Sequence, residues 1–154
     1  MLIRFGKKKQ NKWHNKPCEY KGIKFASHKE RDRYIFLEGR QNAGEITDLR
    51  CQYDIEIIPH ITETIDVQLK TKVKQKTVVV QKAIEYRADF VYTRDGNIVY
   101  EDVKGSKGDA NGKGTLTKVY QLKKKLLRAL KGIEVVEIYN PTEWTHVNYG
   151  KKPR

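Results

Sequence analysis

The dipeptide Asp95-Gly96 limits the fold of this chain more than any other feature, because it separates two runs of strand-forming residues. Asp-Gly is one of the preferred two-residue connections of a β-hairpin, since both positions take a positive φ. The run before it covers residues 86–93, and the run after it covers residues 97–104. We therefore expect these two runs to pair as antiparallel neighbours in a sheet.

The register of this hairpin brings two acidic residues together. If Arg94 pairs with Asn97 across a two-residue turn, Asp89 lies directly opposite Asp102. Opposed residues have Cβ atoms about 4.5–5.5 Å apart, so two carboxylates there must share a proton or a cation. Mg²⁺ is the natural cation beside a polyanion. Lys104 follows Asp102 on the same strand face, where its ammonium can position a water and stabilise charge on phosphorus.

A helix begins before this hairpin. Ser27 and Glu30 have the spacing of a capping box, and the pattern predicts a helix over about 28–43 that ends at Gly44. Glu30 lies in the first turn on the apolar face, which should meet the sheet. It either reaches the metal or the water, or only completes the cap with Ser27.

The remaining strands are read from alternation and turn residues. Residues 51–58 alternate and predict a strand. Residues 60–76, rich in Thr, Val and Lys, form either an extra hairpin or an arm. A strand over about 77–93 follows, with a break near Lys82.

The last two elements are a helix and a strand. Apolar residues at helical spacing predict an amphipathic helix over about 115–131, stopped by Gly132, and a final strand over 133–139. The apolar positions of that helix are Leu116, Val119, Leu122, Leu126 and Leu130.

These elements follow in the order α-β-β-β-α-β and predict an α/β (α+β) fold, with a mixed central sheet flanked by helices. The length of 154 residues suits one domain. We assign residues 21–145 to that domain, residues 1–20 to a basic flexible arm and residues 146–154 to a basic tail.

The charge is strongly basic and unevenly distributed. Lys and Arg number 32 against 19 acidic residues, which gives a net charge of +13. Residues 1–33 and 103–132 each carry a net +8, whereas residues 34–102 carry a net −3. Such basic blocks favour a polyanion, most simply nucleic acid, through release of counterions. The acidic middle would repel phosphate unless a cation lies between them.

Three groups of residues are candidates for contact with DNA. Two of the groups lie in the N-terminal arm and in a glycine-rich segment. The third lies on one face of the second predicted helix, where it could equally form an ordinary solvated surface. The candidates are Lys7, Lys8, Lys9, Lys12 and Lys16 in the arm, Lys107 and Lys113 in a glycine-rich segment, and Lys118, Gln121 and Lys125 on the helix.

The sequence lacks the apolar runs of a membrane span and the apolar core of a secretory signal, so we expect a cytoplasmic protein and no membrane partner. Cys18 and Cys51 lack metal-ligand or redox spacing. We expect both to be reduced thiols.

Taken together, Ala88-Asp89-Phe90, Glu101-Asp102-Val103-Lys104-Gly105 and Glu30 in an N-terminal helix resemble the PD-(D/E)xK nuclease superfamily. The resemblance covers about residues 27–139, although Ala88 replaces the proline that is common before the first aspartate. It implies a restriction-endonuclease-like core in which Asp89, Asp102 and Glu30 bind metal and Lys104 is the catalytic lysine.

More narrowly, the chain resembles small phage-encoded proteins and endonucleases of the Holliday junction resolvase type. That resemblance implies an Mg²⁺-dependent DNA endonuclease, with Mn²⁺ able to substitute, that prefers branched DNA. It would leave 5′-phosphate and 3′-hydroxyl ends and would act in the cytoplasm of a bacterial host. The alternatives are a less selective restriction-like or flap nuclease and a replication accessory protein that binds nucleic acid without cutting it.

A junction needs two symmetric cuts, so we expect a homodimer. Residues 59–82 are not required by the core and offer material for an interface. The alternative is a monomer in which these residues only extend the sheet.

Overall fold

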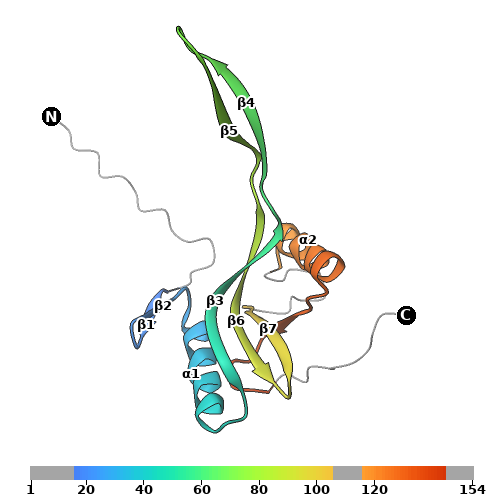
Figure 1. Ribbon diagram of the computed structural model, residues 1–154. Coiled ribbons are helices and arrows are strands. Elements are labelled where there is room, and N and C mark those ends of the chain that lie inside the picture. The colour runs from blue at the N-terminus through green and yellow to red at the C-terminus, as the bar shows by residue number, and fades with distance from the viewer. Residues whose placement is uncertain (1–15, 106–115, 145–154) are drawn as a thin grey trace, which may run out of the picture.

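A computed structural model describes residues 16–105 and 116–144 of the chain, and its elements are drawn in Figure 1. They are β1 (Cys18–Tyr20), β2 (Ile23–Phe25), α1 (His28–Asn42), β3 (Thr47–Ile58), β4 (Ile61–Gln68), β5 (Val73–Gln81), β6 (Ile84–Arg94), β7 (Asn97–Val103), α2 (Lys118–Leu126), the π-helical turn η1 (Leu127–Lys131) and β8 (Val135–Ile138). The central sheet has the order β3-β6-β7-β8, and β1-β2 and β4-β5 form separate hairpins.

The central sheet is mixed, because β8 runs parallel to β7 while the other pairs are antiparallel. Hydrophobic residues pack on both of its faces. On the α1 side the buried residues are Phe25, Leu37, Ile46, Phe90, Tyr92 and Val99. On the side of α2 and η1 they are Ile55, Ile57, Tyr86, Ala88, Val91, Leu127 and Val135. The α/β class expected from the sequence, with a mixed sheet and two helices, is therefore confirmed.

The β6–β7 hairpin has the predicted register. Arg94 pairs with Asn97, and Phe90 pairs with Glu101. Asp95 and Gly96 both have positive φ, +51° and +75°, as a two-residue turn of this type requires. Regular pairing extends to Phe90 and Glu101, so Asp89 and Asp102 are the next residues along the two strands.

Strand β6 turns over at Asp89. Tyr86 and Ala88 pack on the α2 side of the sheet, whereas Phe90 packs on the α1 side. A regular strand would place these alternate residues on one face. The neighbouring strand β3 is also irregular here, since Gln52 has a φ of +51°. The side chain of Asp89 therefore leaves the normal alternation.

Helix α1 begins and ends as predicted. The Ser27 side chain accepts a hydrogen bond from the backbone N–H of Glu30, 3.2 Å away. Gly44, just beyond the helix, has a φ of +75°, a conformation that glycine adopts without strain.

The buried face expected for the second helix was only partly right, because Leu126 packs against the core but most of the other apolar positions do not. Val119, Leu122 and Leu130 are 63%, 58% and 55% exposed, while Leu127 is fully buried. The helix presents Tyr120 and Lys124 to the sheet, because both bond to Glu137 on β8. The expected single helix is also divided, since the turn η1 replaces regular α-helix after Leu126. Gly132 ends it with a φ of +65°, as predicted.

Residues 61–81 form the extra hairpin that was one of two alternatives for this region. Strands β4 and β5 pair with each other and project away from the central sheet (Figure 1). Strand β5 ends at Gln81 and β6 begins at Ile84, so the break near Lys82 is confirmed. Strand β3 begins at Thr47, four residues before the predicted start.

The arm is shorter than expected, because Cys18–Tyr20 form β1, and Cys18 and Tyr20 pack against the core on the α1 side. Residues 1–15, 106–115 and 145–154 lie outside the described part, and so do Lys7, Lys8, Lys9, Lys12, Lys107, Lys113 and the predicted tail. In the described residues, no helix is long and apolar enough to cross a membrane.

Candidate active site

The predicted carboxylate pair lies where β6 and β7 separate. Asp89 accepts a hydrogen bond from the backbone N–H of Val103, with Oδ2 2.7 Å from the nitrogen. Asp102 precedes Val103 and is 7% exposed. The side chain of Asp89 thus takes the place of a backbone carbonyl of β6 as the acceptor for Val103. This bond holds the carboxylate of Asp89 at the end of β7.

The pKa of Asp89 reflects this position. Burial and the neighbouring Asp102 raise the pKa of Asp89 to about 8, against the opposing effect of the hydrogen bond from Val103. Two buried carboxylates so close together share a proton when no cation is bound. The site is therefore built to take up positive charge.

Lys104 supplies part of that charge. Its ammonium forms an ion pair with Asp102, and both side chains are largely buried. The same ammonium lies 3.7 Å from the centre of the Tyr120 ring, a cation–π contact that holds the lysine between β7 and α2. The Asp-x-Lys spacing read from the sequence does bring these two charges together.

Glu30 lies at the start of α1 and completes the cap. Its carboxylate accepts hydrogen bonds from the Ala26 backbone N–H at 3.1 Å and from the Ser27 hydroxyl at 3.2 Å. Burial raises the pKa of Glu30, the two hydrogen bonds oppose this, and the charges of Asp102 and Lys104 also act on it. Glu30 is thus a cap residue that also lies within the electrostatic reach of the Asp102–Lys104 pair.

Lys29, the residue before Glu30, joins α1 to the end of β7. Its ammonium donates hydrogen bonds to the carbonyl oxygens of Lys104 at 2.8 Å and Gly105 at 3.0 Å. This fixes the start of the helix beside the site. The sequence analysis did not single out Lys29, whose bonding partners are more than 70 residues away.

Glu137 is a third acidic residue at the site, on β8 beside Asp102. It accepts hydrogen bonds from Tyr120 at 3.2 Å, Lys124 at 2.7 Å and Tyr139 at 2.7 Å. Burial acts to raise the pKa of Glu137, but these bonds lower it overall. Glu137 was not predicted, because its partners Tyr120 and Lys124 lie on another element and no local pattern marks it.

Tyr86 contributes a buried hydroxyl from β6. Burial, followed by the charge of Asp102, raises the pKa of Tyr86. Among the described residues its hydroxyl has no hydrogen-bond partner of standard geometry. A buried polar atom without a partner is uncommon and costs free energy. Tyr86 thus leaves a hydrogen-bonding group available next to the carboxylates.

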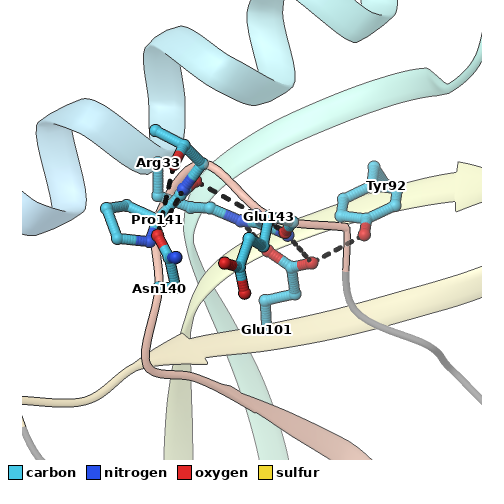
Figure 2. A network of polar contacts seen from close by, with 7 residues as sticks. Arg33, Tyr92, Glu101, Asn140, Pro141 and Glu143 are labelled. Carbon is cyan, nitrogen blue, oxygen red and sulfur yellow. Dashed lines mark hydrogen bonds and ion pairs between the residues drawn. The ribbon is translucent and has the colours of Figure 1, made fainter.

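Glu101 lies on the face of β7 opposite to Asp102, and it is fully buried. It receives two hydrogen bonds from Arg33 on α1, at 2.6 and 2.8 Å, and a third from Tyr92 at 2.6 Å. Arg33 also bonds to the carbonyl oxygens of Pro141 and Glu143 (Figure 2). This network ties α1, β7 and the segment after β8 together beneath the site.

The predicted DNA-contacting residues of α2 are exposed. Lys118, Gln121 and Lys125 all face solvent. Gln121 and Lys125 line a surface depression that also includes Lys124 and Arg128. Lys118 and Lys125 are therefore accessible positive charges, and the depression beside Gln121 and Lys125 extends to Glu137 at the site.

Asp89 and Asp102 form the candidate metal site, and Glu30 lies near enough for the charge of Asp102 to act on its pKa. Within residues 16–105 and 116–144, no group of three or more His, Cys, Asp or Glu side chains is arranged to hold a metal ion. Cys18 and Cys51 are free thiols, as predicted, and burial raises the pKa of Cys51 to about 11.

The family described as "Protein of unknown function (DUF1064)" matches residues 10–142 of this chain. The chain belongs to this family. The part matched to DUF1064 includes every described helix and strand and all four candidate catalytic residues. Comparison with curated proteins and with solved structures found no match.

Proposed function

We propose that this protein is an Mg²⁺-dependent DNA endonuclease with a restriction-endonuclease-like core. One observation carries the proposal: half-buried Asp89 and buried Asp102 meet at the end of β7, and Lys104 is ion-paired to Asp102. The helix and strands around the sheet follow the order α1, β3, β6, β7, α2 and β8. This order is the α-β-β-β-α-β sequence that the resemblance to PD-(D/E)xK nucleases implies.

The donor set fits a hard divalent cation. Mg²⁺ in enzymes is commonly bound by one or two carboxylates, completed by waters and substrate phosphates. Asp89 and Asp102 would hold it, with Glu30 assisting from the start of α1, and Mn²⁺ would substitute. When bound, the cation would supply Lewis-acid polarisation of the scissile phosphate.

The chain's own residues then have separate roles. Asp102 holds the ammonium of Lys104, and Tyr120 limits its movement. The ammonium donates a hydrogen bond to the attacking water or to a phosphate oxygen, and so stabilises the charge that develops on phosphorus. The water oxygen bonds to phosphorus as the bond from phosphorus to the 3′-oxygen breaks. The attacking water loses a proton to solvent and the 3′-oxygen takes one up from solvent, which gives 5′-phosphate and 3′-hydroxyl products.

A second candidate is a protein that binds nucleic acid without cutting it, such as a replication accessory factor. The role of Glu30 in the helix cap favours this candidate, because its carboxylate is already hydrogen-bonded. The basic surface of α2 fits both candidates. The buried carboxylate pair favours the nuclease, because placing like charges together is unfavourable and has no use in binding DNA.

The proposal includes a preference for branched DNA and a homodimer. One site cuts one strand, so paired cuts across a junction need two copies of the chain. A less selective restriction-like or flap nuclease would act as a monomer. Both cysteines are free thiols, a state that the cytoplasm maintains, and we place the activity there.

Matched linear, flap and four-way DNA substrates test the proposal directly. We expect cleavage with Mg²⁺ or Mn²⁺, none with EDTA, and faster cleavage of the four-way junction. Sedimentation velocity should give a dimer of the 18.0 kDa chain. A monomer that cuts all three substrates equally would contradict branch selectivity, and binding without cleavage would favour the accessory-protein candidate.

A further inference from the structure

One face of the β4–β5 hairpin combines aliphatic side chains with lysines. Its pairing places Ile65 opposite Lys76 and Val67 opposite Lys74. At the end of the hairpin, the backbone N–H of Leu69 bonds to the carbonyl of Lys72 at 2.8 Å. Because side chains alternate along a strand, these residues share one face. That face carries one row of aliphatic side chains and one row of lysines.

The lysine row is exposed and evenly spaced. Lys72, Lys74 and Lys76 are all exposed, and none forms an ion pair with a described residue. Alternate residues on a strand lie about 7 Å apart. The aliphatic row opposite lets each lysine stem lie along apolar surface while its ammonium stays in water. The hairpin therefore presents a linear array of positive charge.

We propose that this hairpin is a DNA-binding arm whose lysine row, Lys72, Lys74 and Lys76, contacts the phosphate backbone of duplex DNA. The inference rests on the proposed function only in taking DNA as the polyanion. Residues 61–82 carry five lysines and two acidic residues, so their charge is complementary to phosphate. A two-stranded ribbon also has dimensions that the major groove of DNA admits.

The same charges argue against a second copy of the chain as the partner of this face. Two copies meeting there would bring two lysine rows together, with Glu63 as the acidic residue on each face. Like charges directly opposed across strands are destabilising. Self-association through residues 59–82, expected from the sequence, is thus disfavoured on the lysine face.

The length of the arm sets how much DNA it needs. Lys76 is 13 residues from Asp89 along the chain. At about 3.4 Å per residue these span at most about 45 Å, the length of roughly 13 base pairs. The arm therefore extends up to roughly 13 base pairs from the bond that is cut, and a much shorter duplex does not span both the site and the arm.

Binding measured over a range of salt concentrations in EDTA tests this inference without any cleavage. The double variant Lys74→Gln/Lys76→Gln should flatten the plot of log affinity against log salt by about 1.8 on a duplex of about 30 base pairs. On a duplex of about 8 base pairs, the double variant should have the same affinity and the same salt slope as the unmodified protein. Lys74→Arg/Lys76→Arg should retain the original slope.

A charge-matched control separates a specific contact from a loss of net charge. Lys24 and Lys131 are exposed lysines on β2 and at the end of η1, and Lys24→Gln/Lys131→Gln should leave the slope unchanged. Equal effects of both double variants would overturn the inference. An unchanged slope with weakened dimerisation would overturn it in favour of self-association. If the unmodified protein cleaves DNA but Lys74→Gln/Lys76→Gln has an unchanged salt slope, only this inference is overturned. If the double variant has a flatter salt slope but the unmodified protein does not cleave DNA, only the nuclease proposal is contradicted.

Discussion

The carboxylate of Asp89 accepts a hydrogen bond from the backbone N–H of Val103, with 2.7 Å between the oxygen and the nitrogen. In a regular sheet, a backbone carbonyl oxygen would be the acceptor. This hydrogen bond lies where the regular pairing of β6 with β7 stops, and both acidic side chains lie beside it. The bond also holds Asp89 next to Asp102. Burial and the charge of Asp102 raise the pKa of Asp89 to about 8. The local break in the sheet and the unusual electrostatics of the site thus have the same structural origin.

The raised pKa of Asp89 predicts that the protein without metal loses stability as the pH rises. The pKa is about 8 in the folded chain against an ordinary value of 3.8, so the folded state holds its proton more tightly. The stabilisation is complete below about pH 4 and is lost as the pH rises toward 8. Thermal unfolding in EDTA should show a melting temperature that falls between about pH 5 and pH 8.

Two comparisons assign that effect to the site. Asp89→Asn carries no titrating group and should remove most of the pH dependence, whereas Asp48→Asn, at an exposed position, should retain it. Mg²⁺ should restore the melting temperature above pH 8, because the cation replaces the shared proton. A pH dependence that persists in Asp89→Asn would contradict the assignment.

The hydroxyl of Tyr86 predicts an unusual response to deletion. Because this buried hydroxyl has no hydrogen bond of standard geometry among the described residues, Tyr86→Phe should leave the free energy of unfolding unchanged or raise it by about 1 kcal/mol. Tyr120→Phe removes a hydrogen bond to Glu137 and should cost about 1 kcal/mol. Urea unfolding of the two variants measures both values, and a clear loss of stability in Tyr86→Phe would mean that the hydroxyl is bonded.

The ion pair between Arg33 and Glu101 should make a large contribution to the integrity of the fold. Both side chains are fully buried, so Glu101→Ala leaves a buried guanidinium without its carboxylate and should cost about 3–5 kcal/mol. Asp32→Ala breaks a surface ion pair with Arg31 and should cost at most about 1 kcal/mol. Similar losses in chemical denaturation would contradict the structural role given to Glu101.

The basic N-terminal residues should contribute to DNA affinity in proportion to their charge. Removing residues 1–16 deletes Lys7, Lys8, Lys9, Lys12 and Lys16. The slope of log affinity against log salt should become less steep by about 0.9 for each phosphate that these lysines neutralise in the full chain. Titrations at several salt concentrations measure this slope, and an unchanged value would show that these residues do not touch DNA.

The pairing of β6 with β7 was predictable because its determinants are local. Asp95 and Gly96 fix the turn, and the turn fixes which residues face each other across the two strands. The ends of α1 were predictable for the same reason, since Ser27 and Gly44 act on adjacent backbone groups. The candidate pair Asp89 and Asp102 follows from this local register alone.

Features set by distant contacts were not predictable. The orientation of the second helix depends on Glu137, which bonds Tyr120 and Lys124 and leaves Val119 and Leu122 exposed. Apolar spacing alone indicated a face centred on Val119, Leu122 and Leu126, of which only Leu126 packs against the core. The burial of Glu101 likewise depends on Arg33, 68 residues away, and neither residue carries a local signal.

Cleavage of a four-way junction by Asp102→Asn is the sharpest test of the proposed active site, because this change removes one charge from the carboxylate pair and keeps the size of the side chain. With Mg²⁺, we expect loss of most cleavage, and DNA affinity should be kept or increased, since a repulsive charge is gone. Asp48→Asn, a matched change at an exposed position, should cleave normally. Full activity in Asp102→Asn would contradict the proposed active site.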